Sequence, residues 1–193
     1  SMTEYWGDWY CDSECGTLKS VLMRRPGAEL DAVKNPSEVR FKAMINAGKA
    51  RAEHDAVADI YRKHGVAVHY VEGFPAMEAR RGEERYAAEA LARLGVPIIL
   101  TVHGDGIFEG ACAMWVDRES IILGSGCRAN EAGIEQVEWT LRNIGVRNII
   151  KVQIPFGHAH LDGLMNIPDK RKIMLFPWQV SHDMCRQLMD MGF

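Results

Sequence analysis

The amino-acid sequence predicts an α/β fold built from repeated modules of strands and one helix. Three segments combine an amphipathic helix, a glycine after the helix and a β-branched strand: ADIYRKHGVAVHYVE, AEALARLGVPIILTV and EWTLRNIGVRNIIKVQIP. Glycine is favoured there because it adopts the left-handed backbone conformation that ends many helices. These glycines, with a fourth in CRQLMDMGF, are Gly65, Gly95, Gly145 and Gly192, at intervals of 30, 50 and 47 residues. The two agreeing intervals indicate a structural repeat.

The elements before Gly95 follow from hydrophobic periodicity and turn residues. LKSVLMRRPG predicts a single inner strand, and a long stretch after it ends in a helix over 49–63. A strand over 66–72 and a helix over 80–94 come next, with only GFPAMEA between them. This interval therefore contains one strand and one helix.

The two longer intervals each contain three strands and one helix. Alternating apolar residues and short turns predict the strands of the first interval over 96–102, 113–117 and 120–126, and its helix over 131–143. The same order appears in the second interval, with strands over 146–154, 163–169 and 172–177 and a helix over 180–191. In both intervals the second and third strands form a hairpin.

Two parts of the repeat have no counterpart in the sequence. The interval after Gly65 is shorter by one hairpin, near residues 73–76, and the chain stops at Phe193, where a further strand would begin. An unpaired sheet edge beside an apolar helix face is costly in a soluble protein. We therefore expect one domain over 1–193 that lacks this hairpin and the C-terminal module of a longer protein. The alternative is a final strand that another chain supplies or that is simply absent.

Composition narrows the classes of function. The chain has 193 residues, 47% of them apolar and 25% charged, with a net charge of −3, which is typical of one soluble globular domain. It has no basic patch and no apolar run near 20 residues, so neither nucleic acid nor a membrane is an expected partner. Without a signal-peptide core, the expected location is the cytoplasm. The five cysteines lack paired spacing and are expected to be reduced thiols.

Three short segments hold the residues with chemical potential. DGIFEGACAMWVD places Glu109 between a strand and a glycine turn, and GSGCRANEAG places Arg128 at the start of a helix. PFGHAHLDGLMNI alternates His158, His160 and Asp162, which an extended backbone would point to one face. There a carboxylate could orient an imidazole, or both could meet a ligand. Each residue alone is more often a turn or surface residue, but their equivalent places in consecutive modules favour one common site.

These segments carry a resemblance to a known family. The ordered set SECGTLKSVLMRRPG, RRGEERYAAEALARLGVP, FEGACAMWV, LGSGCRAN and HAHLDG resembles the amidinotransferase, arginine deiminase and dimethylargininase superfamily, the penteins. The resemblance extends from about Glu14 to Phe193. It implies an α/β propeller of five ββαβ modules around a pseudo-fivefold axis, incomplete in this chain.

The resemblance also implies a reaction. In this superfamily a cysteine thiolate attacks the guanidino carbon of an arginine-like substrate, and water or an amine then resolves the covalent intermediate. The implied function is thus a guanidino-group-modifying enzyme, either an amidinotransferase or an arginine or guanidine hydrolase. Its partner is a small guanidino molecule such as arginine or a derivative. No metal and no organic cofactor are implied, and a homo-oligomer is one of the expected assemblies.

The family's site residues match several positions of this chain. By the resemblance, His160 is the general acid and base, and Glu109 is a charge partner for the substrate cation or for the imidazolium. Asp162 is the implied contact of the guanidinium group. Arg128 would hold the substrate carboxylate by a bidentate fork, and Arg81 in RRGEER would be a second carboxylate contact.

The departures from the family pattern concern the nucleophile. The family's reactive cysteine lies in the last module, and none of the five cysteines here stands in its motif, so the nucleophile is unknown. Cys112 stands where the family has the aspartate of EGxD, and we expect it to be a small buried thiol. Ala129 replaces a threonine of the family's RTN motif. The alternative is a degenerate, non-catalytic pentein that acts as a binding or oligomeric interaction protein. A haloacetamidine would distinguish the two, because it inactivates a reactive cysteine covalently and would not react with the non-catalytic protein.

Overall fold

The computed structural model describes residues 11, 13–39, 41–71 and 83–193. By internal contacts the chain forms two compact units. The smaller unit consists of Thr17–Gly95, and the larger unit consists of Ser1–Gly16 with Val96–Phe193. The stretch near 73–76, where a hairpin is expected to be lacking, lies outside the described residues.

The smaller unit contains two parallel strands and the long helix between them. Its elements are β1 (Ser20–Met23), the 3-10 helix η1 (Pro36–Val39), α2 (Ala47–Lys63), β2 (Ala67–Tyr70) and α3 (Glu83–Arg93). β1 and β2 pair in parallel, as strands joined by a helical crossover do. The side chain of Asn46 accepts a hydrogen bond from the Lys49 N–H (2.9 Å) and so caps α2.

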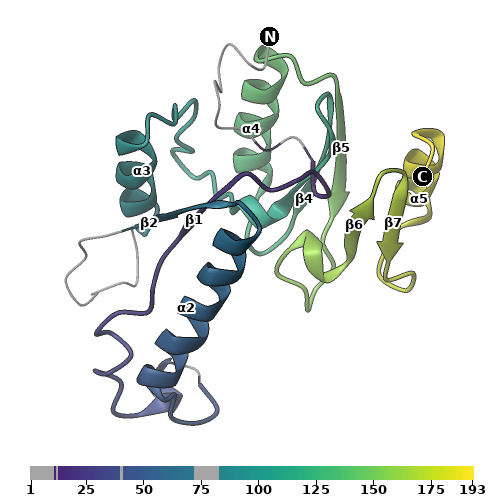
Figure 1. Cartoon of the computed structure of the whole chain (residues 1–193). Helices are drawn as coiled ribbons and strands as arrows, with labels where there is room; N and C mark the ends of the chain where they lie inside the picture. The colour runs from purple at the N-terminus through teal and green to yellow at the C-terminus, as the bar shows by residue number, and fades with distance from the viewer. Residues whose placement is uncertain (1–10, 12, 40, 72–82) are drawn as a thin grey trace. The chain divides into compact units, whose positions relative to one another are not determined.

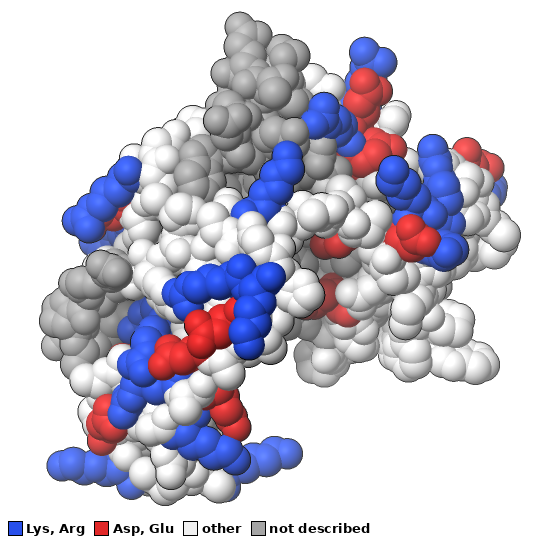
Figure 2. All heavy atoms as spheres, viewed as in Figure 1, with Lys and Arg blue, Asp and Glu red and all other residues white. Residues whose placement is uncertain are grey.

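Exposed ion pairs cover much of the smaller unit. Arg25 binds Asp55 through two hydrogen bonds of 2.7 Å each, and Arg51 binds Asp31 at 2.9 and 3.1 Å. On the face drawn in Figure 2, basic and acidic side chains lie interspersed. Because these pairs are exposed, each contributes only about 0–1 kcal/mol to stability.

The larger unit is centred on a three-stranded sheet. Its strands are β3 (Ala113–Asp117), β4 (Ser120–Ser125) and β5 (Asn148–Gln153), with β4 in the middle. β3 and β4 form an antiparallel hairpin, whereas β4 and β5 run in parallel and α4 (Glu131–Asn143) makes the crossover (Figure 1). The first five residues of β4 are buried, as expected of a central strand that is covered on both faces.

The chain then forms a second hairpin and a final helix. β6 (Met165–Asp169) pairs antiparallel with β7 (Lys172–Leu175), and α5 (His182–Asp190) follows. Single turns of 3-10 helix, η2 (Gly110–Cys112) and η3 (Leu161–Gly163), precede β3 and β6 respectively. The order of elements after residue 103 therefore repeats, as the sequence predicts.

One apolar core joins these elements of the larger unit. Its largest fully buried side chains come from β4, α4, η2, η3, β6 and α5: Ile122, Leu123, Ile134, Cys112, Leu161, Met165 and Leu188. Each such aliphatic side chain contributes about 1.5–3 kcal/mol by leaving water. The core thereby fixes the two 3-10 turns on which the candidate site is built.

The strand predicted over 96–102 is the clearest error of the sequence analysis. This segment pairs with none of the described strands, and Ile98 is 50% exposed. Pro97 has no N–H for a strand ladder. Just after the segment, the Gln136 side chain accepts a hydrogen bond from the His103 N–H and donates one to the His103 carbonyl, both at 3.0 Å. A helix side chain thus satisfies the backbone of His103.

The glycines that end the helices have the predicted conformation. Gly65, Gly95, Gly145 and Gly192 have φ of 77°, 75°, 106° and 89°. Among the described residues the protein is an α/β structure with three separate sheets, none of which closes on itself.

Candidate active site

The backbone places Glu109 and Arg128 side by side. Glu109 has an extended conformation just before η2, and its N–H donates to the Arg128 carbonyl oxygen at 3.0 Å. Phe108 and Ala129 form an antiparallel bridge next to this hydrogen bond. Residues opposite each other in an antiparallel bridge have adjacent side chains. The local fold therefore brings the two predicted residues together.

Asn130 is the residue that holds this loop, and the sequence analysis did not select it. Its Oδ1 accepts hydrogen bonds from the N–H groups of Gly133 and Ile107, both at 2.9 Å, and its Nδ2 donates to the Asp105 carbonyl at 2.7 Å. One amide therefore caps α4 and ties down the residues just before Glu109. The available signal was an asparagine at the N-cap position of a predicted helix.

His160 reaches Glu109 from the other side of the site. Its Nε2 lies 2.7 Å from Glu109 Oε2, while Arg128 Nη1 donates to Glu109 Oε1 at 3.0 Å. The three side chains are partly open to solvent: 28% for His160, 43% for Glu109 and 52% for Arg128. Each carboxylate oxygen of Glu109 thus has a different partner.

The charges of the site determine the protonation of the histidine ring. The hydrogen bond from His160, with the nearby Arg128 charge, lowers the pKa of Glu109. An ionised carboxylate can only accept hydrogen bonds, so the proton between the two groups belongs to His160 Nε2. In the neutral imidazole the basic nitrogen is then Nδ1. The geometry makes Nδ1 the atom that can take up or release a proton.

The segment that carries His160 is anchored by its neighbours. Leu161 is fully buried, and a Cβ atom at Gly124 would come within 2.9 Å of its side chain, so glycine leaves room for it. The Cys112 sulfur lies 3.8 Å from the Ala159 carbonyl oxygen, and the Cys127 sulfur lies 3.9 Å from that of His158. These contacts hold the backbone on both sides of the site.

The predicted alternation of His158, His160 and Asp162 is wrong in its premise. The segment is a turn, with Gly157 at φ 101°, followed by a bend and a 3-10 helix, so it is not extended. The His158 ring packs against Phe176 instead, with ring centroids 6.4 Å apart. Glycine and the proline before it favour a turn, which the alternation argument overlooked.

The remaining predicted residues are placed as follows. Asp162 is exposed, and its side chain has no hydrogen-bond or ion-pair partner within the part of the chain that the structure describes. Arg81 lies outside the described residues. Cys112 is fully buried, and burial raises the pKa of its thiol. A reactive cysteine requires a lowered pKa, so the properties of Cys112 are those of a core residue.

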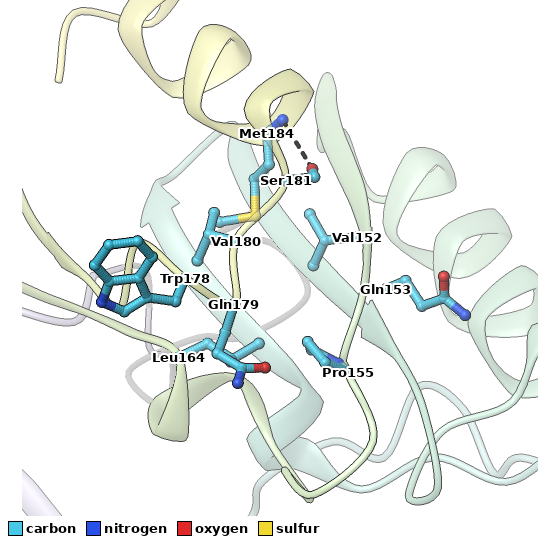
Figure 3. A pocket seen from close by; sticks show the side chains of 9 residues that line it. All are labelled: Val152, Gln153, Pro155, Leu164, Trp178, Gln179, Val180, Ser181 and Met184. Carbon is cyan, nitrogen blue, oxygen red and sulfur yellow. Dashed lines mark hydrogen bonds between the residues drawn. The ribbon is translucent and has the colours of Figure 1, made fainter.

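A hollow in the larger unit does not contain these residues. It has a volume of about 520 Å³, and Figure 3 shows Val152 of β5 facing Val180 and Met184 near the start of α5, while the Gln153 side chain points away from them. Trp178, which is 86% exposed, stands at its edge, and Ser181 caps α5 beside it. Glu109, Arg128 and His160 are not among its lining residues. We therefore place the candidate site by its hydrogen-bonded side chains.

The described residues contain no group of three or more His, Cys, Asp or Glu side chains that could hold a metal ion. None of their helices is long and apolar enough to cross a membrane.

Comparison with known proteins gives relatives of one kind. The chain is 37% identical over 95 residues to an arginine deiminase of Mycolicibacterium gilvum, covering 46% of this chain and 24% of that protein. The matched part spans about a quarter of the length of the arginine deiminases that it matches. No protein-family model matches the chain.

Solved structures show the same fold. The N-terminal domain of the cyanobacterial arginine dihydrolase ArgZ superposes with a TM-score of 0.67 at 15% identity, covering 91% of this chain and 72% of that one. The dimethylarginine dimethylaminohydrolase of Pseudomonas aeruginosa, complexed with citrulline, has a TM-score of 0.64 at 19% identity, covering 83% and 70%. The ordered motifs, the repeated elements and these relatives agree: part of the chain is similar in sequence to arginine deiminases, its fold is that of these solved structures, and both confirm the resemblance to the amidinotransferase, arginine deiminase and dimethylargininase superfamily, the penteins.

Proposed function

We propose that the protein modifies the guanidino group of an arginine-like small molecule, by hydrolysis or by amidino transfer. The observation that carries this proposal is the hydrogen-bonded set of Arg128, Glu109 and His160. Support comes from the arginine deiminases that the chain resembles and from a structural neighbour that was solved with citrulline.

The proposed chemistry needs one nucleophile and one proton carrier. His160 takes the proton of a cysteine thiol, and the resulting thiolate attacks the guanidino carbon; the C–N bond to the leaving amine then breaks as the imidazolium passes that proton to the amine. Water that gives its proton to the same imidazole, or an amine acceptor, then displaces the thiolate. We assign the proton transfers to Nδ1 of His160, since Nε2 is engaged by Glu109. The nucleophile is not assigned, because Cys112 is buried and its pKa is raised.

The substrate contacts follow from charge. Asp162 carries an exposed carboxylate two residues from His160, and we propose that it binds the guanidinium group. Arg81 is proposed to bind the substrate carboxylate. Glu109 already accepts one hydrogen bond on each oxygen, which favours the imidazolium over the substrate as its partner.

The propeller architecture belongs to the same proposal. β3, β4 and β5 show one complete pattern, a hairpin followed by a parallel strand from the next repeat. β6 and β7 repeat the hairpin, and β1 and β2 repeat the parallel pair. We propose that these sheets are blades of a pentein propeller.

Ligand binding and product formation test this function separately. L-Arginine, agmatine and dimethylarginine are titrated into the protein by calorimetry, and citrulline and released amine are measured. We expect binding that Glu109→Gln weakens by about tenfold, since one good charged hydrogen bond changes affinity by roughly that factor. Glu119→Gln is the matched control, because Glu119 pairs with Arg147 at 3.4 Å away from the site. Binding without turnover would favour the non-catalytic alternative, and the absence of any binding would refute the proposal.

A further inference from the structure

We propose that Arg128 is a positioning residue, which holds the Glu109 carboxylate in the orientation that His160 requires. The inference rests on the proposed function and deepens it. It differs from the carboxylate fork that the resemblance implies for Arg128. Among the residues that the structure describes, Arg128 is the arginine in direct contact with the candidate acid–base pair.

The first argument is that the backbone fixes the Arg128–Glu109 pair in advance. The Glu109 N–H donates to the Arg128 carbonyl at 3.0 Å, and the neighbouring residues Phe108 and Ala129 form a bridge. A mobile surface ion pair must order two long side chains, which is why such pairs are weak. Here the two Cα atoms are already held opposite each other, so less freedom is lost when the side chains meet.

The second argument is the division of the carboxylate between two partners. Arg128 Nη1 binds Oε1 at 3.0 Å and His160 Nε2 binds Oε2 at 2.7 Å. Without the first contact the carboxylate could rotate about its last bond, since this torsion is broad in glutamate. The cation therefore restricts the rotation of the group that orients the imidazole.

The third argument is electrostatic. The titratable groups described at the site are Arg128, Glu109, His160, the exposed Asp162 and the thiols of Cys112 and Cys127, and Arg128 is the permanent cation among them. A cation at this distance favours the ionised carboxylate, which is the form that can only accept a hydrogen bond from Nε2. The lowered pKa of Glu109 has the His160 hydrogen bond as its first cause and includes the Arg128 charge.

The two roles for Arg128 predict different behaviour toward two ligands. L-Arginine has a carboxylate, whereas agmatine has the same guanidinium head without it. If Arg128 binds the substrate carboxylate, Arg128→Gln should weaken the binding of L-arginine alone. If Arg128 is a positioning residue, the substitution should weaken the binding of both ligands by the same factor, because it disturbs the groups that contact the guanidinium head.

The test uses the whole chain and begins with a readout that needs no ligand. The carboxyl carbon of Glu109 is followed by NMR through a pH titration in the wild type, Arg128→Gln and Arg128→Lys. We expect Arg128→Gln to raise the Glu109 midpoint by about half a pH unit, a reduced effect for an exposed pair. Arg128→Lys should restore part of the difference. Arg142→Gln is the control, since Arg142 is 50% exposed and pairs with Glu138 on α4.

The binding measurement then separates the two roles. L-Arginine and agmatine are titrated into the same variants. An equal fold-loss of affinity for both ligands, together with the shifted Glu109 midpoint, supports the positioning role. An unchanged Glu109 midpoint overturns the inference, and so does a loss confined to L-arginine. If the wild type binds neither ligand, the proposed function fails, while the Glu109 titration alone still decides the role of Arg128.

Discussion

Replacing Gly133 by alanine tests how the Glu109 loop is held against α4. Gly133 is the third residue of α4, and a Cβ atom there would overlap the Ile107 carbonyl oxygen and come within 2.7 Å of the Ile107 carbonyl carbon. In most helices the change from glycine to alanine stabilises by about 1 kcal/mol. Here it must push the loop away from the helix.

The cost can be estimated from the hydrogen bonds that the displaced loop would lose. Asn130 donates to Ile107 O at 3.1 Å and to Asp105 O at 2.7 Å, and it accepts from the Ile107 N–H at 2.9 Å. Each such bond contributes about 1 kcal/mol net. After the gain in helix propensity, we expect a net destabilisation of about 2 kcal/mol. For a chain of this size that lowers Tm by about 4–8 °C.

The assay is urea unfolding followed by circular dichroism, with Tm as a second measure. Gly110→Ala is the control, because a Cβ atom at Gly110 would have no described atom within 4 Å. The Gly133 variant should also weaken ligand binding, since Glu109 follows the displaced loop. A Gly133→Ala protein as stable as the wild type, or more stable, would refute the close packing of this loop on α4.

Three further predictions follow from the same structure. Glu109→Gln should make the free energy of unfolding depend less on pH. Because the pKa of Glu109 is lowered in the folded state, its ionised carboxylate stabilises the fold above about pH 4.3, and this stabilisation is lost as the pH falls through the folded-state pKa. The free energies of unfolding of wild type and variant, measured in urea, should therefore differ more at pH 7 than at pH 3. Iodoacetamide at neutral pH should alkylate the exposed Cys127 and spare the buried Cys112 until the protein unfolds, as peptide mass spectrometry would show. Ser181→Ala removes the hydroxyl that accepts from the Met184 N–H at 3.2 Å and should cost about 1 kcal/mol, measured by unfolding, with Ser181→Thr as rescue.

Each of these has a clear contrary result. A constant difference between the Glu109 variant and the wild type from pH 3 to pH 7 would mean that the carboxylate is not stabilised in the folded state. Equal labelling of Cys112 and Cys127 would contradict the burial of Cys112. An unchanged unfolding energy for Ser181→Ala would mean that the cap contributes nothing to α5.

The candidate site shows what a local pattern can predict. Glu109, Arg128 and His160 were selected from short segments far apart in the sequence, and the structure brings their side chains together. His158 was selected by the same reasoning and does not join them. Its position depends on a turn at Gly157, and the direction of a side chain after a turn cannot be deduced from alternation.

The sequence by itself determined the order and type of most elements and the places where most helices end. These are local properties: hydrophobic period decides helix or strand, and a glycine such as Gly145 ends a helix because only a residue without a Cβ atom adopts its φ of 106° easily. The tertiary structure decided that 96–102 is not a strand and that Asn130 holds the loop of Glu109. It also decided that Arg128 binds Glu109. The physical reason is that a strand needs a second strand for its backbone hydrogen bonds, and a polar side chain needs a hydrogen-bonding group beside it. Both are supplied by segments that are distant in the sequence.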